Sequence, residues 1–264
     1  MVAEIISVGT ELLLGNIVNT NAQYLAGRLT ELGFDMYFQT VVGDNTEHLK
    51  EALDNAYRHA DLVIMTGGLG PTKDDLTKEM LAAYFGKTLA FHQASFDNVV
   101  KHVHAFGATE ITENHRKQAM IPTDSLILNN EHGTAPGCVM ENNGKIVVLL
   151  PGPPREMQPM FEQCVEQYLY KLVSKAIASV MIRLKTREEA PADRVGEAPV
   201  ARRLGELVDL ENPTVATYAQ ENGVLIRITA SAPTKAEALM MARIIGAQCK
   251  ERIGDDVIRE ITEE

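Results

Sequence analysis

The sequence contains no tryptophan, and its aromatic residues make up only 5% of the 264 positions. Surfaces that stack the bases of single-stranded nucleic acids depend on such side chains. Lysine and arginine number 25 against 36 aspartates and glutamates, which gives a formal net charge of −11. Because a nucleic-acid backbone is bound by clustered cations, we expect no nucleic-acid partner. A small anionic ligand stays open, since one site can be locally positive or can use a metal.

Cysteines are few, and long apolar runs are missing. Cys138, Cys164 and Cys249 lie far apart without Cys-x-x-Cys spacing, which predicts reduced thiols and a cytoplasmic location. No apolar stretch reaches the length needed to span a bilayer. The chain opens with the strand-like residues 3–9 rather than with a secretory leader. We therefore expect neither a signal peptide nor a membrane partner.

Short apolar runs alternate with helical patterns in the first part of the chain. The runs at 3–9, 34–43 and 61–66 are each followed by apolar residues that recur every three to four positions. This order predicts an α/β fold with a mainly parallel sheet and helices on both faces. Residues 91–120 look polar and helical, without a strand signal. Short strands are expected over 121–150.

The chain changes pattern near residue 175. An Asn-Asn-Gly turn at 142–144 and a proline-initiated helix precede this break, and a β-α-β-β-α order follows it. In the later segment we predict a hairpin turn at Asn222-Gly223 and a last helix that begins at Pro233-Thr234. The sequence thus predicts two domains, 1–172 and 173–264, of which the second is a small α+β domain.

A glycine-rich loop, TGGLGPTKDD at residues 66–75, joins the buried run DLVIM to a helix. Open α/β sheets bind ligands at the carboxyl ends of their strands. Gly67, Gly68 and Gly70 allow backbone amides to approach a ligand closely, and the helix start adds its positive dipole end. The loop matches neither a Walker A loop nor GxGxxG. It still predicts a phosphate-binding site.

Two carboxylates end this loop, and alone they would repel a phosphate. A divalent cation between them removes the conflict, because carboxylate and phosphate oxygens can share its coordination shell. Asp74 and Asp75 therefore indicate phosphoryl chemistry with a metal-activated water. A simpler interpretation stays open, in which one of them is only the N-cap of the next helix.

Two further stretches are expected beside this loop at the same edge of the sheet, residues 9–21 and 129–137. In the first, Asn19, Thr20 and Asn21 open a helix, where Asn21 could bind a ligand or serve only as an N-cap. In the second, His132 could act as a base or a ligand, although a single loop histidine is more often neither. Further on, Glu156 near a helix start suggests a site residue, but a first-turn glutamate is also ordinary helix-dipole chemistry.

Four motifs in sequence, GTELLLGNIVNTN, TGGLGPTKDDLT, NEHGTAPG and LPGPPREM, resemble those of the CinA family (competence/damage-inducible protein A). The resemblance covers residues 1–170 and implies the molybdopterin-binding fold shared with MoaB, MogA and MoeA proteins. The stretch NPTVATYAQENGVLIRITASA resembles the KH-like middle domain of the same family. Many relatives continue into a nicotinamide-nucleotide amidohydrolase domain, an activity not predicted for a chain that ends at Glu264.

The resemblance implies a metal-dependent pyrophosphatase that acts on ADP-ribose or a similar nucleotide. It makes Asp75 and Asp74 the catalytic and metal-binding candidates, with a divalent cation such as Mg²⁺ or Co²⁺ and with K⁺ left open as a monovalent ion. The candidate ligand-binding residues are Gly9, Thr10, Glu11, Asn19, Asn21, Thr66, Gly67, Gly68, Gly70, Thr72, Lys73, Gly133, Thr134, Pro151, Gly152 and Glu156.

Three functions remain open at this point. The first is hydrolysis of a nucleoside diphosphate compound, the second is binding or transfer in molybdenum-cofactor metabolism, and the third is a non-catalytic nucleotide sensor. The extra aspartate favours the first. The resemblance and the apolar helix around 240–246 also suggest a homodimer, unless Met240, Met241, Ile244 and Ile245 simply pack on their own sheet.

Overall fold

A computed structural model describes residues 1–264 except 73, 74, 106, 108, 109, 174, 187, 221, 222 and 264. The chain divides into two compact units, which are described one at a time. The first contains residues 1–30 and 34–172, and the second contains 31–33 and 173–264. No helix in the described part of the chain is both long and apolar enough to cross a membrane.

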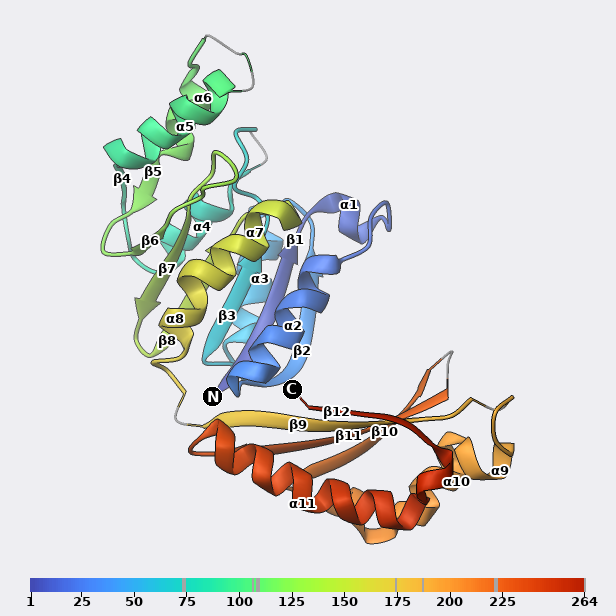
Figure 1. Ribbon diagram of the computed structural model, residues 1–264. Helices are drawn as coiled ribbons and strands as arrows, with labels where there is room; N and C mark the ends of the chain where they lie inside the picture. Colours follow the sequence, from blue (N-terminus) through green and yellow to red (C-terminus); the bar gives the residue numbers. More distant parts are fainter. Residues whose placement is uncertain are drawn as a thin grey trace. The chain divides into compact units, whose positions relative to one another are not determined.

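The first unit is built around a six-stranded sheet in the order β2-β1-β3-β8-β7-β6 (Figure 1). Strands β2, β1, β3 and β8 run parallel, whereas β7 is antiparallel to both its neighbours. The strands are β1 (Val2–Val8), β2 (Asp35–Val42), β3 (Leu62–Thr66), β6 (Leu126–Leu128), β7 (Gly137–Asn142) and β8 (Lys145–Leu150). All five residues of β3 are buried, as befits a strand whose two faces are both covered. The predicted mainly parallel sheet is confirmed.

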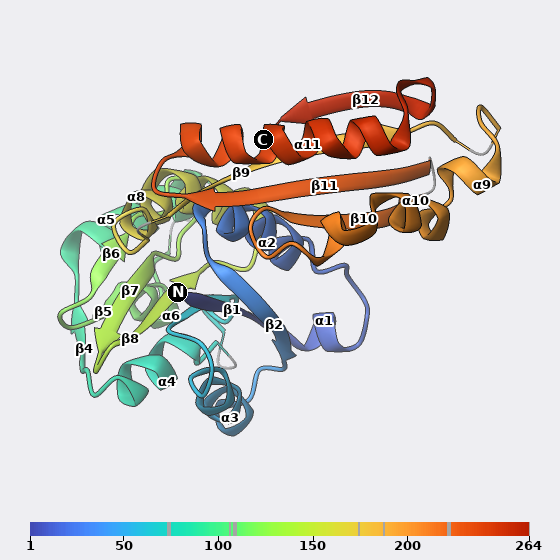
Figure 2. The same ribbon diagram turned by 90° about the horizontal axis from the view of Figure 1, so that it is seen from below.

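Helices cover both faces of this sheet, as predicted. Figure 1 and Figure 2 show α3 and α4 on one face and α2 and α7 on the other. On the first of these faces, Leu49 and Leu53 of α3 join the buried Ile6 and Val63 of the strands in one hydrophobic cluster. The helices of this unit are α1 (Thr10–Leu13), α2 (Thr20–Leu32), α3 (Thr46–Ala56), α4 (Thr77–Tyr84), α5 (Gln93–Ala105), α6 (Glu113–Gln118), α7 (Pro154–Met160), the π-helical η1 (Phe161–Val165) and α8 (Glu166–Leu169).

The segment between β3 and β7 differs in part from the sequence prediction. It contains α5 and α6, as the polar helical pattern indicated, but also a two-stranded antiparallel sheet of β4 (Leu89–Phe91) and β5 (Met120–Pro122). Three residue pairs hold these strands together, and strands this short show no measurable alternation of apolar and polar residues. The later hairpin was predicted correctly: Asn142 pairs with Lys145, and Asn143 and Gly144 both have positive φ, as a tight two-residue turn requires.

The second unit is a four-stranded antiparallel sheet, β10-β11-β9-β12, with helices packed on one face (Figure 2). Its elements are β9 (Ala176–Leu184), α9 (Ala192–Val195), α10 (Glu197–Leu204), the 3₁₀ helix η2 (Gly205–Asp209), β10 (Thr214–Gln220), β11 (Gly223–Ala232), α11 (Lys235–Ile253), the 3₁₀ helix η3 (Asp255–Val257) and β12 (Ile258–Glu263). The small α+β unit was predicted, but the strand β12 was not.

The hairpin of β10 and β11 forms, with Gln220 paired to Gly223. Gly223 therefore belongs to the strand rather than to the turn, and Asn222 lies outside the described residues. The final helix α11 begins as predicted, because Thr234 and Glu237 form a capping box at its start.

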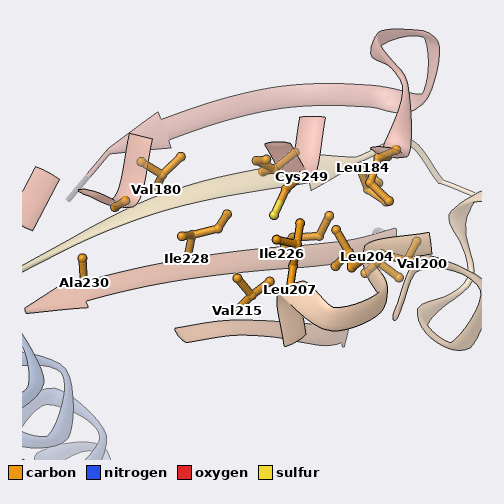
Figure 3. Packing of buried hydrophobic residues seen from close by; sticks show 14 of the residues in the cluster. Val180, Leu184, Val200, Leu204, Leu207, Val215, Ile226, Ile228, Ala230 and Cys249 are labelled. Carbon is orange, nitrogen blue, oxygen red and sulfur yellow. The ribbon is translucent and has the colours of Figure 1, made fainter. Parts of the chain in front are cut away.

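One hydrophobic core fills the space between this sheet and its helices (Figure 3). Ile226 and Ile228 point from β11 toward Leu204 and Leu207, and Cys249 of α11 lies among them. Of the four apolar residues considered for dimerisation, Met241 and Ile245 pack against this core. Met240 and Ile244, by contrast, are 59% and 54% exposed. Packing on the domain's own sheet thus accounts for only half of that apolar stretch.

Candidate functional site

The loops that follow β1, β3 and β8 meet at one edge of the sheet. These three strands are parallel neighbours, so their carboxyl ends lie side by side. The amide of Gly67 donates a hydrogen bond to the carbonyl of Leu150 (3.0 Å), which ties the glycine-rich loop to the end of β8. Between the loops lies a cavity of about 510 Å³, here called the glycine-loop pocket. Its lining comprises Val8, Gly9, Glu11, Asp44, Gly67, Gly68, Leu69, Gly70, Pro71, Thr72, Asp75, Gln118, Thr134, Ala135, Pro151, Gly152, Pro153 and Glu156.

At two glycines of this loop, a side chain would collide with neighbouring atoms unless these moved. Gly67 has φ of +101°, and a Cβ there would lie 2.2 Å from the backbone oxygen of Val8. A Cβ on Gly70 would lie 2.5 Å from a carboxylate oxygen of Asp75. The glycines therefore let the loop turn tightly and let the carboxylate fold back against it.

Asp75 is held inside the loop rather than at the start of the following helix. Its Oδ2 accepts hydrogen bonds from the backbone nitrogen (2.9 Å) and the hydroxyl (2.6 Å) of Thr72. Helix α4 begins at Thr77, with Leu76 in the N-cap position and no side-chain cap. The interpretation of Asp75 as a mere N-cap is thus wrong. Asp74 and Lys73 lie outside the described residues.

Three more carboxylates line the glycine-loop pocket, and two have fixed partners. Oδ2 of Asp44 accepts from the backbone nitrogen and the hydroxyl of Thr10, both at 2.9 Å. Oε2 of Glu156 accepts from Nδ2 of the buried Asn130 at 2.8 Å. Glu11 is the third. No lysine or arginine lines the pocket among the residues that the structure describes.

Three residues around this site were not among the sequence candidates. Asp44 follows the parallel strand β2, and that position could have identified it. Asn130 lies in the stretch 129–137 that was expected here, but its bond to Glu156 was not foreseen. Gln118 could not have been found, because the packing of a distant segment brings it to the pocket.

Two buried polar atoms at or near this pocket have no hydrogen-bond partner in the described part of the chain. One is Oε1 of Gln118, which is 3% exposed and lines the pocket, and the other is the Thr77 hydroxyl beside Gly68. The buried Lys78 donates to the carbonyls of Lys117 and Gln118 (3.2 and 2.9 Å). Burial lowers the pKa of Lys78 from its ordinary value of 10.5 to about 8. Unpartnered buried acceptors are uncommon in proteins and indicate atoms available to a ligand or to water.

A second cavity of about 310 Å³, here called the asparagine pocket, adjoins the first. The two share Val8, Glu11, Gly152 and Pro153. The asparagine pocket is lined by Val8, Glu11, Leu12, Ile17, Val18, Asn19, Thr20, Asn21, Thr66, Gly152, Pro153 and Pro154.

The two asparagines of this pocket have different roles. Oδ1 of Asn19 accepts from the backbone nitrogen of Ala22 (3.1 Å), while its Nδ2 donates to the Ser7 hydroxyl (3.0 Å). Asn19 is therefore the cap of α2. The alternative that Asn21 serves as this cap is wrong, because Asn21 lies inside the helix and its Nδ2 donates to the carbonyl of Gly152 (2.6 Å).

The remaining candidates lie at the margin of these pockets. Gly133 packs against the Glu156 carboxylate and accepts a hydrogen bond from Asn98 at its carbonyl, but it does not line either cavity. Thr10 lines neither cavity, but its backbone nitrogen and hydroxyl donate to Asp44, which lines the glycine-loop pocket. His132 is exposed and also lines neither pocket.

A larger cavity of about 600 Å³ lies along α3, α4 and the turn between β7 and β8. Lys50, Asp54, Tyr84 and Lys145 are among its lining residues. None of the candidate residues and no part of the glycine-rich loop lines this cavity. We therefore do not assign the phosphate site to it, despite its larger volume.

Comparison with known proteins places this geometry in a family. Residues 4–171 match the model of a probable molybdopterin binding domain, and residues 194–258 match that of the damage-inducible protein CinA KH domain. The crystal structure of the protein CinA from Thermoplasma acidophilum is 35% identical in sequence. It aligns with a TM-score of 0.58, over 63% of this chain and 96% of that chain.

The chain belongs to the CinA family.

Longer CinA-family relatives are also similar. A competence-damage inducible protein of Clostridium acetobutylicum is 48% identical over 258 residues, which are 97% of this chain and 61% of that protein. A CinA-like protein of Kosmotoga olearia is 47% identical over 256 residues, 97% of this chain and 60% of the relative. The chain thus spans about three fifths of the length of these curated relatives.

Proposed function

We propose that the first unit is a metal-dependent pyrophosphatase, which hydrolyses ADP-ribose or a related nucleoside diphosphate compound. One observation carries this proposal: the glycine-loop pocket is lined both by the glycines of a strand-to-helix loop and by four carboxylates, Glu11, Asp44, Asp75 and Glu156. Amides suit a phosphate, whereas the carboxylates repel one. A divalent cation between the two sets of oxygens reconciles them.

The residues of this pocket fit such a cation in one particular way. No group of three or more metal-ligating side chains stands preassembled in the described ranges. Mg²⁺ commonly binds one or two carboxylates and keeps its remaining positions for water and substrate phosphates. Asp75 would hold it, since Oδ2 is fixed by Thr72 while Oδ1 has no hydrogen bond to any described residue. Asp74 is the second proposed ligand. The bound cation would lower the pKa of a water and neutralise developing charge on the phosphate.

The protein's own groups bind the substrate and move the proton. Backbone amides of the glycine-rich loop other than those of Gly67 and Thr72, which already have partners, would hold the diphosphate oxygens. Glu156, held at Oε2 by Asn130, would accept at Oε1 a proton from the attacking water. The water oxygen then forms a bond to phosphorus while the bridging P–O bond breaks. ADP-ribose would thereby yield AMP and ribose 5-phosphate.

The experiment that tests this proposal follows both products after incubation of the purified chain with ADP-ribose. We expect AMP and ribose 5-phosphate in equal amounts when Mg²⁺ or Co²⁺ is present, and neither after chelation. A parallel series with K⁺ in place of Na⁺ tests the monovalent ion. Absence of both products at every metal concentration would refute the hydrolase.

A second candidate is supported by the family match itself. The model that covers residues 4–171 describes a probable molybdopterin binding domain. Binding of a molybdopterin compound without hydrolysis of ADP-ribose would favour a role in cofactor metabolism. Binding of a nucleotide without turnover would instead favour a sensor.

We infer a cytoplasmic protein whose partner is a small nucleotide rather than a nucleic acid. The three cysteines are free thiols, and the net charge of −11 opposes binding to a polyanion. Retention of RNA on a filter at physiological salt, with a steep salt dependence, would contradict this inference.

A further inference from the structure

We propose that the asparagine pocket receives the nucleoside end of the substrate, and that Oδ1 of Asn21 recognises it by accepting a hydrogen bond from a sugar hydroxyl or a base amino group. This inference rests on the proposed function, because it assigns the second half of a ligand whose phosphates lie in the glycine-loop pocket.

The orientation of the Asn21 amide is set by its neighbour. The carbonyl of Gly152 can only accept a hydrogen bond, so the Asn21 atom 2.6 Å from it must be the amino group Nδ2. Oδ1 is then the other atom, and it is buried without a hydrogen-bond partner among the residues that the structure describes. A buried acceptor without a partner destabilises the free protein, and a ligand that supplies a donor relieves this.

An acceptor at this place selects the chemistry of the ligand. The diphosphate of a nucleotide bears only acceptors near neutral pH, so it cannot satisfy Oδ1. Ribose hydroxyls and the amino group of adenine can donate to it. Asn21 therefore distinguishes the nucleoside end of the ligand from its phosphate end.

The residues that line only the asparagine pocket are more apolar than those that line only the glycine-loop pocket. Leu12, Ile17, Val18 and Pro154 line only the asparagine pocket, whereas Asp75, Glu156 and the three glycines of the glycine-rich loop line only the other. The apolar wall of the asparagine pocket suits the flat ring of a nucleobase. Ile17 and Val18 are 53% and 80% exposed, an unusual state for large aliphatic side chains that contact with a base would change.

The two pockets also share part of their walls, as binding of one ligand with two different ends requires. Val8, Glu11, Gly152 and Pro153 line both of them. Gly152 is at once part of this shared wall and the partner of Asn21. A nucleoside held by Asn21 would therefore place its 5′ phosphate toward the glycine-rich loop.

The first test uses the unaltered protein and four ligands in Mg²⁺: AMP, 2′,3′-dideoxy-AMP, inosine 5′-monophosphate and inorganic pyrophosphate. The dideoxy compound lacks the two sugar donors, and the inosine compound lacks the amino group. We expect calorimetry to show that one of these two analogues binds about tenfold to hundredfold more weakly than AMP, the effect of leaving a buried acceptor unpaired. Equal affinities for AMP and both analogues would overturn the inference.

The second test uses Asn21→Ala, with Asn16→Ala in the loop before α2 as a matched control. Asn16 is exposed and lines neither pocket. We expect Asn21→Ala to weaken AMP binding about tenfold or more while pyrophosphate binding stays unchanged, and Asn16→Ala to change neither. Equal loss of AMP and pyrophosphate would show that Asn21 only supports the loop at Gly152, and the inference would fail.

The two proposals fail in different ways. If ADP-ribose is hydrolysed but AMP binding does not depend on Asn21 or on its donors, the nucleoside assignment is wrong and the hydrolase stands. If AMP binding depends on Asn21 but no hydrolysis occurs, the assignment stands and the hydrolase is wrong. If neither AMP binding nor hydrolysis is found, both are wrong.

Discussion

Individual residues of the site show what a sequence pattern can and cannot settle. The glycines and Asp75 of the glycine-rich loop were identified as site candidates from their place after a buried strand, and they line one pocket. The pattern could not decide whether Asn21 binds a ligand or caps α2, because asparagine suits an N-cap. The observed bond from the Ala22 backbone nitrogen to Oδ1 of Asn19 shows that Asn19 is the cap.

Gly67 gives a prediction on stability. Gly67→Ala should lower the free energy of unfolding by at least about 1–3 kcal/mol, because alanine is strained at φ of +101° and its Cβ would meet the Val8 oxygen at 2.2 Å. Urea unfolding measures this change. Gly27→Ala is the matched control: it lies within α2, and its new Cβ would meet no described atom within 4 Å beyond the neighbouring backbone of its own helix, so it should be neutral or stabilising by up to about 1 kcal/mol. Equal effects of the two substitutions would contradict the account of the loop.

Lys78 gives a prediction on pH dependence. Its pKa is about 8 in the folded protein against an ordinary value of 10.5, so between these values the unfolded chain binds more protons. The free energy of unfolding therefore gains a contribution that is absent below pH 8 and grows as the pH rises toward 10.5. Lys78→Met should lack this gain, so denaturant unfolding should show the stability of the variant falling relative to wild type between pH 8 and 10. A constant difference across that range would contradict the burial of a charged amine.

Whether the sequence predicted a helix or strand depended on the length of that element and on how distant in the chain its pairing partner is. The central strand β3 was predicted because it is a continuous apolar run before a glycine-rich turn, and α3 because its apolar residues recur at helical spacing. Strands β4 and β12 were missed, whereas β5 overlaps the start of the stretch where short strands were expected. Strand β4 has only three residues, and β12 alternates weakly and depends on pairing with the distant β9.

The capping box of α11 gives a prediction at this scale. The hydroxyl of Thr234 accepts from the Glu237 backbone nitrogen (3.2 Å), and Glu237 Oε2 accepts from the Thr234 nitrogen (3.2 Å). Thr234→Ala should destabilise the second unit by about 0.5–2 kcal/mol, while Thr234→Asp should retain most of the stability. Thermal unfolding of the two variants provides the measurement. An alanine variant as stable as wild type would show that the cap contributes nothing.

The whole molecule could be predicted only in outline, as two units and a family. Side chains that meet across loops, such as Asn130 with Glu156, depend on the folded arrangement and leave no spacing signal. The homodimer suggested by the resemblance also stays a prediction. Met240 and Ile244 remain exposed on α11, and such apolar residues are often covered in an assembly.

Sedimentation at micromolar concentration tests that prediction. We expect a mass twice that of the chain, with Ile244→Glu shifted toward the monomer because a charge would then be buried at the contact. A single monomeric species for the wild type would rule the dimer out. A dimer unaffected by Ile244→Glu would place the contact elsewhere.

The most direct measurement of the central claim is the metal titration of ADP-ribose hydrolysis by wild type and Asp75→Asn. Asp75 packs against Gly70 in an exposed loop, so the substitution should cost only about 1 kcal/mol of stability, as a cap alteration does. Turnover should fall by several powers of ten, because a metal-activated water is worth several kcal/mol of barrier and each ~1.4 kcal/mol is a factor of ten. The remaining activity should require far more metal. Wild-type turnover with wild-type metal dependence in Asp75→Asn would contradict the proposed mechanism.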